Sequence, residues 1–168
     1  MSHEHLVEDE VIFRVLTVSS SRSVETDRSG KTIRRMIDEA GHTVEDRGIV
    51  KDVSADIFEY IEGSVASPAG VLIITGGTGI SSKDQSVDVL KRLETKELPG
   101  FGELFRSLSY NEIGARAILS RARASLVDDT LVFVLPGSTE AVKLGMKELI
   151  LPAVGHALFE MNKEAGGR

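Results

Sequence analysis

Short apolar runs alternate along this chain with segments in which apolar residues recur every three or four positions. The runs Val11 to Val18 and Val71 to Ile74 are rich in β-branched residues, which predicts strands buried on both faces of a sheet. The recurring segments have the spacing of one face of an amphipathic helix. The predicted strands are residues 11–18, 43–50, 71–75, 123–127 and 131–135, and the predicted helices are residues 31–40, 54–65, 86–95, 101–111, 138–150 and 152–162. The second helix is expected to turn inward Ile57, Phe58, Ile61 and Val65.

This alternation predicts an α/β fold with a doubly wound, mostly parallel sheet and helices on both faces. The last two strands are the exception, because only Asp128-Asp129-Thr130 separates them, and this predicts a short antiparallel pair. The 168 residues fit a single domain, which we assign to residues 11–168. Residues 1–10 are predicted to form a disordered or extended N-terminal tail.

Ligands of doubly wound sheets bind outside the carboxyl ends of the parallel strands. In this chain the loops at those ends are polar, and we expect them to converge on one edge of the sheet. They are Ser19-Ser20-Ser21, Lys51-Asp52, residues 75–84 and Pro136-Gly137-Ser138.

Composition excludes several classes of function. The chain has no cysteine, so disulfides, thiolate catalysis and zinc–thiolate sites are excluded. No apolar stretch is long enough to cross a bilayer, and the acidic segment Met1 to Glu10 lacks the features of a signal peptide. A net charge of −6 argues against nucleic acid as a partner. We therefore expect a cytoplasmic protein that binds neither nucleic acid nor membranes, and an anionic substrate would need local positive groups or a metal.

Thr75-Gly76-Gly77-Thr78-Gly79, directly after the third predicted strand, carries the strongest chemical signal. Three glycines within four positions let the backbone take positive φ values and bring its N–H groups close to an anion. Asp84 and Asp88 follow, and carboxylates beside a phosphate repel it unless a divalent cation lies between them. The segment indicates a magnesium-bound phosphate ester, although a plain turn between strand and helix is the alternative.

Two common phosphate-binding motifs do not fit. Ser29-Gly30-Lys31-Thr32 ends like a P-loop, but Glu25 stands where that motif requires glycine. Residues 77–82 fail the dinucleotide-binding fingerprint, because Ser82 stands where its third small residue should be glycine or alanine.

A family does fit. Six segments occur in a characteristic order and spacing. They are Leu16-Thr17-Val18-Ser19, Asp27-Arg28-Ser29-Gly30, Thr75-Gly76-Gly77-Thr78-Gly79 with Asp84 and Asp88, Pro99-Gly100-Phe101-Gly102-Glu103, Ile118-Leu119-Ser120-Arg121 and Leu135-Pro136-Gly137-Ser138. Together they resemble the MoaB/MogA family of molybdenum cofactor biosynthesis, to which the gephyrin G domain is similar, and the MoaB branch is the most alike. The resemblance covers residues 11–158.

This resemblance implies Mg-ATP-dependent adenylylation of molybdopterin, which gives adenylyl-molybdopterin and pyrophosphate. The implied cofactor is Mg²⁺, and ATP and molybdopterin are the substrates. The family also implies a homotrimer or homohexamer and hand-over of the product to a metal-insertion protein that adds molybdenum or tungsten.

The same resemblance assigns roles to residues. Asp84 matches the catalytic, magnesium-associated aspartate, and Asp52 matches the second functional aspartate, so both are expected at the metal. Gly137 and Ser138 open a helix whose free N–H groups favour the pterin phosphate. The residues expected to bind substrate are Ser19, Asp27, Ser29, Thr75, Gly76, Gly77, Thr78, Gly79, Ser82, Asp88, Pro136, Gly137 and Ser138.

Several of these residues have a simpler interpretation. Asp27 could form an Asx-turn, Asp52 could be a solvated acid, and Ser138 could be an ordinary N-cap. Asp84 and Asp88, four residues apart near a helix start, could serve only the helix dipole. Arg121 could pair with phosphate or lock the turn at residues 128–129.

The chain departs from the family pattern at three positions. Ser20 stands where aspartate is common, and Lys51 and Val87 replace common prolines. The alternative function is a non-catalytic protein of the same pathway that binds pterin or nucleotide or acts as a scaffold. Retention of Asp52 and Asp84 favours the enzyme.

Overall fold

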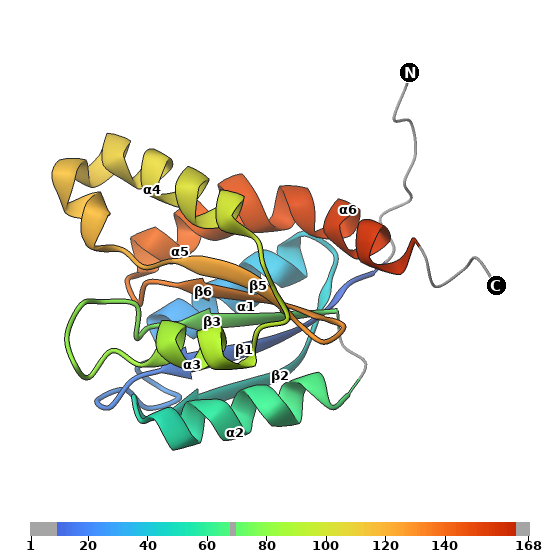
Figure 1. The fold of residues 1–168 in the computed structure, drawn as a ribbon, viewed down its shortest axis with the longest axis horizontal. Helices are drawn as coiled ribbons and strands as arrows, with labels where there is room; N and C mark the ends of the chain where they lie inside the picture. Colours follow the sequence, from blue (N-terminus) through green and yellow to red (C-terminus); the bar gives the residue numbers. More distant parts are fainter. Residues whose placement is uncertain (1–9, 68–69, 164–168) are drawn as a thin grey trace.

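A computed structural model describes residues 10–67 and 70–163 of the chain. The tail predicted for residues 1–10 lies outside this part except for Glu10. Six strands form one sheet in the order β2-β1-β3-β6-β5-β4 (Figure 1). The strands are β1 (Ile12–Val18), β2 (Thr43–Val50), β3 (Val71–Thr75), β4 (Lys96–Glu97), β5 (Arg123–Val127) and β6 (Thr130–Leu135).

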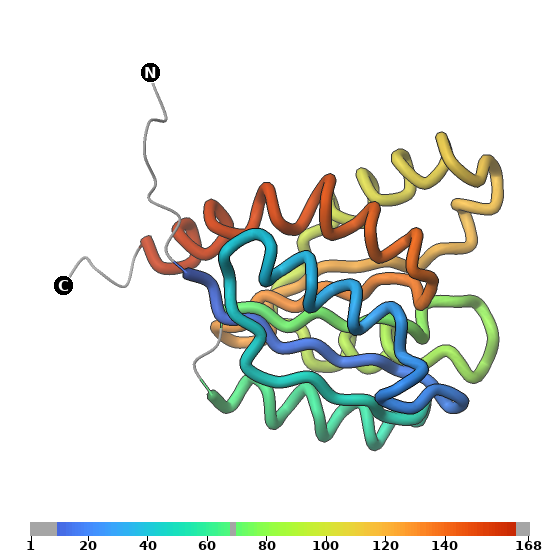
Figure 2. Tube along the Cα trace, turned by 180° about the vertical axis from the view of Figure 1, so that it is seen from behind, coloured from blue at the N-terminus to red at the C-terminus, as the bar shows by residue number. Residues whose placement is uncertain are grey.

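Helices cover both faces of this sheet. They are α1 (Arg28–Glu39), α2 (Ser54–Val65), α3 (Ser86–Leu93), α4 (Pro99–Ile113), η1 (Gly114–Leu119), α5 (Thr139–Gly145), η2 (Met146–Ile150) and α6 (Leu151–Asn162). Figure 2 shows α1 and α6 on one side of the sheet and α2 on the other. In the described part of the chain, no helix combines the length and the apolar character that a membrane crossing needs.

The strand directions confirm the predicted doubly wound, mostly parallel sheet. β1 pairs in parallel with β2 and β3, and β3 pairs in parallel with β6. The last two predicted strands are the antiparallel pair β5 and β6, and β4 adds a second antiparallel contact. Thr75 is in register with Thr17 on one side and Leu135 on the other. The carboxyl ends of the three central strands therefore lie level, and the loops that follow them meet.

Alternation along the strands divides the core into two layers. Phe13 and Ile73 face the layer under α1, α5 and α6, and Leu16 and Ile74 face the layer under α2 and α3. All four side chains are fully buried, as the unbroken apolar runs predict for a sheet covered on both faces. The central strands are thereby fixed from both sides, which holds their carboxyl ends in place.

Some boundaries differ from the prediction. α1 begins at Arg28 rather than Lys31, because the side chain of Asp27 accepts a hydrogen bond from the N–H of Gly30 and caps the helix three residues earlier. The two helices predicted at the end of the chain run on without a break through the π-helical turn η2. This turn ends two residues before Pro152, whose missing N–H would leave an α-helical hydrogen bond unmade.

Three further details were not predicted correctly. Phe58 was expected in the core but is 37% exposed, because the buried stripe of α2 consists of Ile57, Ile61 and Ser64. β4 and the 3-10 helix η1 were not predicted. Two residues of an edge strand and a single irregular turn are too short to produce a hydrophobic period.

Candidate functional site

The glycine-rich loop after β3 takes a backbone conformation that glycine adopts readily and other residues do not. Gly76 and Gly77 have φ values of 100° and 71°. A Cβ atom on Gly76 would overlap the carbonyl oxygen of Val18, and one on Gly77 would overlap the hydroxyl of Ser86. The loop of residues 75–79 is therefore held closely between the end of β1 and the start of α3.

Hydrogen bonds tie this loop to the loop after β6. The buried hydroxyl of Thr75 donates to the carbonyl oxygen of Pro136 at 3.0 Å. The N–H of Gly76 donates to the carbonyl oxygen of Leu135 at 2.9 Å. Thr78 is buried as well. Thr75 and Pro136 thus meet at the expected edge, and the Thr75 hydroxyl is bonded within the protein.

Asp52 and Asp84 approach each other from the loops after β2 and β3. The Oδ1 atom of Asp52 accepts a hydrogen bond of 3.0 Å from the N–H of Gln85, the residue that follows Asp84. The Oδ2 atom of Asp84 accepts one of 3.0 Å from the N–H of Ser81. A Cβ atom on Gly79 would lie 2.6 Å from the same Oδ2 atom. The Asp84 carboxylate is therefore against the backbone of the glycine loop.

The negative charge of Asp84 acts on the neighbouring carboxyl group of Asp52. Burial raises the pKa of Asp52 above its ordinary value, and the negative charge of Asp84 raises it further, while the hydrogen bond from Gln85 opposes both effects. A partly buried pair of like charges is a place where a cation would be stabilised.

Arg121 makes hydrogen bonds with the glycine loop and with the segment that follows it. Its guanidinium donates to the carbonyl oxygens of Gly79 at 2.9 Å and Asp84 at 3.1 Å. It also makes a bidentate contact with Asp88, with Nη1 3.0 Å from each carboxylate oxygen. Arg121 therefore bonds this loop and Asp88, and the interpretation in which it locks the turn at residues 128–129 is wrong. Asp88 is the partner of Arg121 and does not join the Asp52–Asp84 pair.

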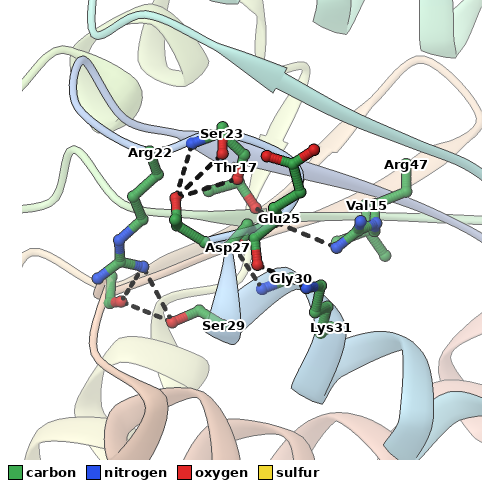
Figure 3. Close-up of polar contacts among 12 residues, drawn as sticks. Val15, Thr17, Arg22, Ser23, Glu25, Asp27, Ser29, Gly30, Lys31 and Arg47 are labelled. Carbon is green, nitrogen blue, oxygen red and sulfur yellow. Dashed lines mark hydrogen bonds and ion pairs between the residues drawn. The ribbon is translucent and has the colours of Figure 1, made fainter.

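Asp27 lies in a network at the start of α1, which Figure 3 shows. Its carboxylate is fully buried, and its Oδ1 atom accepts a hydrogen bond of 2.9 Å from the N–H of Gly30. The Oδ2 atom accepts from the hydroxyl of Thr17 at 2.8 Å and lies 3.3 Å from Nη1 of Arg47. Asp27 therefore joins α1 to β1 and β2, and all of these contacts are within the protein.

Ser29, Gly137 and Ser138 lie where the start of α1 meets the loop after β6. The hydroxyl of Ser29 donates to the carbonyl oxygen of Gly137 at 2.7 Å. The hydroxyl of Ser138 accepts from the N–H of Ala141 at 3.2 Å, so Ser138 is the N-cap of α5, as its simpler interpretation had it. Nη1 of Arg22 reaches the same place, 3.2 Å from the Gly137 oxygen.

The remaining two expected substrate-binding residues lie in exposed loops of the edge. The hydroxyl of Ser19 accepts hydrogen bonds from the N–H groups of Ser21 and Arg22 at 3.3 and 3.1 Å. Ser82 lies in the exposed segment before α3, where its carbonyl oxygen accepts from Nε2 of Gln85 at 2.6 Å.

Two groups of expected site residues thus form at one edge of the sheet. One contains Asp52, Asp84 and Gly79, and the other contains Ser29, Thr75 and the loop after β6. Sequence reasoning missed the residues that connect them to the fold, namely Arg22, Arg47, Gln85 and Ser86. Arg22 had one usable signal, because it is the only cation in the polar loop that follows β1 directly.

Within the described residues, no group of three or more His, Cys, Asp and Glu side chains is placed to hold a metal. Asp52 and Asp84 place two carboxylates at this edge of the sheet. Such a pair suits a cation that takes its other ligands from a bound phosphate or from water.

A cavity of about 310 Å³ is lined in part by Arg121, the residue that bonds the glycine loop. Its wall is partly apolar and partly cationic, and includes Val87, Leu98, Pro99, Arg106, Ile118 and Ser120. The guanidinium of Arg106 donates to the carbonyl oxygen of Ala122 at 3.2 Å. A second cavity, of about 470 Å³, includes Arg14 and Ser67 and lies at the other end of the sheet, away from the Asp52–Asp84 pair.

Comparison with known proteins gives consistent relatives. A family model described as the probable molybdopterin binding domain matches residues 8–156. The molybdenum cofactor biosynthesis protein B of Bacillus subtilis (strain 168) is 42% identical over 164 residues, which is 96% of each chain.

Solved structures agree with this similarity. A crystal structure of a molybdenum cofactor biosynthesis protein B aligns with a TM-score of 0.90 at 40% identity, and covers 93% of this chain and 98% of the other. The tungsten cofactor synthesizing protein MoaB from Pyrococcus furiosus aligns with a TM-score of 0.82 at 34% identity, and covers 90% and 97%.

Proposed function

The chain belongs to the molybdenum cofactor biosynthesis family whose domain is described as a probable molybdopterin binding domain, and from this premise we propose that it adenylylates molybdopterin. In this proposal ATP gives its adenylyl group to the phosphate of molybdopterin. The products are adenylyl-molybdopterin and pyrophosphate, and the adenylylated pterin then receives molybdenum or tungsten.

One observation carries the proposal. The Asp84 carboxylate lies against Gly79 of the glycine loop, and its charge raises the pKa of Asp52 on the neighbouring loop. A glycine loop supplies backbone N–H groups for phosphate, and a coupled carboxylate pair beside it supplies the charge for a cation. This combination suits transfer between two phosphates, and a purely structural role for Asp84 does not need the second carboxylate.

The reaction forms one bond and breaks one bond at the α-phosphorus of ATP. An oxygen of the pterin phosphate bonds to this phosphorus, and the bond from it to the oxygen that bridges to the β-phosphate breaks. Pyrophosphate leaves with the electron pair. The attacking phosphate is already ionised at neutral pH, so no base has to remove a proton. The chain therefore contributes by positioning the two phosphates and by offsetting their charge.

Magnesium fits the residues at this edge. Mg²⁺ prefers oxygen ligands, and in phosphate sites it commonly takes one or two carboxylates besides phosphate oxygens and water. Asp52 and Asp84 would hold it, which agrees with the raised pKa of Asp52. When bound, the ion would offset the negative charge of the ATP phosphates. The role of Asp84 and Asp52 would be to hold the positive charge of this ion beside the glycine loop.

The cavity lined by Arg121 is our candidate for the site of the pterin ring. It shares Arg121 with the loop, because the guanidinium that lines the cavity also bonds the Gly79 and Asp84 carbonyl oxygens. Apolar side chains such as Leu98 and Pro99 can cover a flat ring, while Arg106 and Ser120 offer polar groups at its edge. A pterin there would lie next to the phosphate-binding loop.

We also propose that the chain forms a closed homo-oligomer, a trimer or two trimers paired as a hexamer. Support comes from a set of exposed apolar side chains on α4 and η1, two adjacent elements. These are Leu104, Tyr110, Ile113, Ile118 and Leu119. An apolar surface of this kind favours contact with another copy of the chain.

The test is incubation of the purified protein with molybdopterin, ATP and Mg²⁺, followed by measurement of adenylylated pterin and pyrophosphate. We expect both products in equal amounts. Binding of pterin and nucleotide without product, under conditions where a known family enzyme reacts, would instead favour the non-catalytic pathway protein.

A further inference from the structure

Arg22 places a positive charge at the edge of the sheet that the glycine loop and the acidic pair also occupy. It lies in the loop between β1 and α1, and Figure 3 shows its guanidinium beside Ser29. Nη1 is 3.3 Å from the Ser29 hydroxyl and 3.2 Å from the carbonyl oxygen of Gly137. The side chain therefore crosses from the loop after β1 to the loop after β6.

The charge of Arg22 has no counter-ion in residues 10–67 and 70–163. Other arginines at or near this edge are paired, as Arg47 is with Asp27 and Arg121 with Asp88. Arg22 meets no carboxylate in the same part of the chain, and its hydrogen bonds there use only Nη1 among the side-chain nitrogens. Nε and Nη2 make no hydrogen bond in this part of the chain. A guanidinium uses such a pair of donors to bind phosphate in a bidentate manner.

Hydrogen bonds within the protein hold both the backbone and the side chain of Arg22. Its backbone N–H donates to the Ser19 hydroxyl at 3.1 Å, and the Ser29 hydroxyl donates to the Gly137 oxygen at 2.7 Å. The loop of Gly137 is adjacent to the glycine loop, since a Cβ atom on Gly137 would lie 3.5 Å from Cα of Gly76. The guanidinium is thus held by both of its neighbours near the loop that we assign to phosphate, which lowers the entropic cost of binding.

We propose that Arg22 binds the phosphate group of the pterin substrate. The inference rests on the proposed function, which makes that phosphate the group that attacks ATP. Charge divides the edge in a way that suits two anionic reactants, because the Asp52–Asp84 pair matches a cation that accompanies ATP. Arg22, on the loop after β1, meets the phosphate that arrives without a metal. A bidentate contact still leaves an oxygen of this phosphate free to react.

The test compares a pterin with and without its phosphate. Molybdopterin, oxidised to a stable fluorescent pterin, is titrated before and after phosphatase treatment into the wild-type protein and into Arg22→Gln. We expect the wild type to bind the phosphorylated pterin about 10-fold more tightly, as one charged hydrogen-bonding group at an exposed site supplies. Arg22→Gln should lose most of this preference, and Arg22→Lys should recover only part of it because lysine lacks the forked pair of donors.

Two controls make the result specific. Arg35→Gln removes the same charge from the exposed face of α1, where Arg35 pairs with Glu39, and should keep the wild-type preference. ATP affinity should change little in Arg22→Gln. An undiminished phosphate preference in this variant, or a loss confined to ATP, would overturn the assignment of Arg22.

The measurement also separates this inference from the proposed function, because binding does not require turnover. If the wild type yields no adenylylated pterin but shows the phosphate preference that Arg22→Gln lacks, adenylylation fails and the role of Arg22 stands. If the wild type makes the product and Arg22→Gln keeps the preference, the role of Arg22 fails and adenylylation stands.

Discussion

The negative charge of Asp84 raises the pKa of Asp52, although the two residues lie in loops that follow different strands of the sheet. Burial is the larger cause of the raised pKa, so Asp52 is both partly removed from water and close to a like charge. Without a cation this arrangement costs free energy in the ionised state. The cost indicates that the pair is kept for binding rather than for stability.

The first prediction concerns the stability of Asp52→Asn in the absence of metal. An acid whose pKa is higher in the folded chain binds its proton more tightly when folded, so the folded form loses stability as the pH rises through that pKa. Asparagine removes this loss. We expect Asp52→Asn to unfold at a higher denaturant concentration than the wild type at pH 8, and the difference to close as the pH falls toward the pKa of Asp52.

Magnesium should reduce or reverse the stability advantage of Asp52→Asn over the wild type. Mg²⁺ stabilises the ionised pair, so adding it should raise the unfolding midpoint of the wild type more than that of Asp52→Asn. Glu59→Gln, at an exposed position on α2, is the matched control and should respond to Mg²⁺ as the wild type does. Equal responses in all three proteins would remove the pair as a magnesium site.

The second prediction separates two glycines of neighbouring loops. Gly77 has a positive φ and no room for a Cβ atom beside Ser86, whereas a Cβ atom on Gly137 would meet no atom closer than 3.5 Å. We expect Gly77→Ala to lower the free energy of unfolding by about 2 kcal/mol or more, from the left-handed backbone and the overlap together. Gly137→Ala should change it little. Denaturant titration of both variants checks this, and equal losses would contradict the geometry of the glycine loop.

Much of the fold can be predicted from the sequence, because strands that are buried on both faces of a sheet consist of consecutive apolar residues. Four consecutive apolar residues before Thr75 identify a central strand, and the short Asp128-Asp129-Thr130 connection identifies the antiparallel pair. The convergence of the polar loops then follows from the topology of a doubly wound sheet, and the structure confirms it for the loops after β1, β2, β3 and β6.

The contacts that organise the site do not follow from the sequence. Arg22 bonds Gly137, 115 residues away, and Arg121 bonds Asp88, 33 residues away. Such pairs have no periodic spacing, and they depend on where separate loops end in three dimensions. The same holds for Asp27, whose motif position predicted a substrate contact while its buried carboxylate is bonded within the protein. Residue type indicates the chemistry available, but tertiary contact determines which groups are free.

The third prediction concerns the loop that Arg121 holds. Lysine cannot reproduce the bidentate contact with Asp88 together with the bonds to Gly79 and Asp84, so Arg121→Lys should loosen the loop. Lys83 is exposed in the segment between Gly79 and Asp84, whose carbonyl groups Arg121 bonds. Trypsin should therefore cleave after Lys83 several-fold faster in Arg121→Lys than in the wild type. Unchanged cleavage at this bond would show that the loop keeps its position without Arg121.

The fourth prediction concerns assembly. Ile118 is 78% exposed and Leu104 is 57% exposed, so a charged residue at either position should cost the isolated chain little. We expect the wild type to have the mass of a trimer or hexamer in light scattering at micromolar concentration, and Ile118→Glu to have a lower mass. Val24→Glu, at an exposed apolar position on the loop after β1, is the control and should keep the wild-type mass. A monomeric wild type would contradict the proposed oligomer.

The fifth prediction is the most direct test of the central claim, that the chain adenylylates molybdopterin with Asp84 at the metal. The measurement is the single-turnover rate of adenylyl-molybdopterin formation in Asp84→Asn and the wild type, with pterin affinity determined on the same samples. Asparagine keeps the shape and one acceptor oxygen but loses the charge that balances the cation. We predict product from the wild type, a rate lower by orders of magnitude in Asp84→Asn, and little change in affinity. A near wild-type rate in Asp84→Asn would contradict the role of Asp84, and a wild type that binds both substrates without forming product would contradict the proposed reaction.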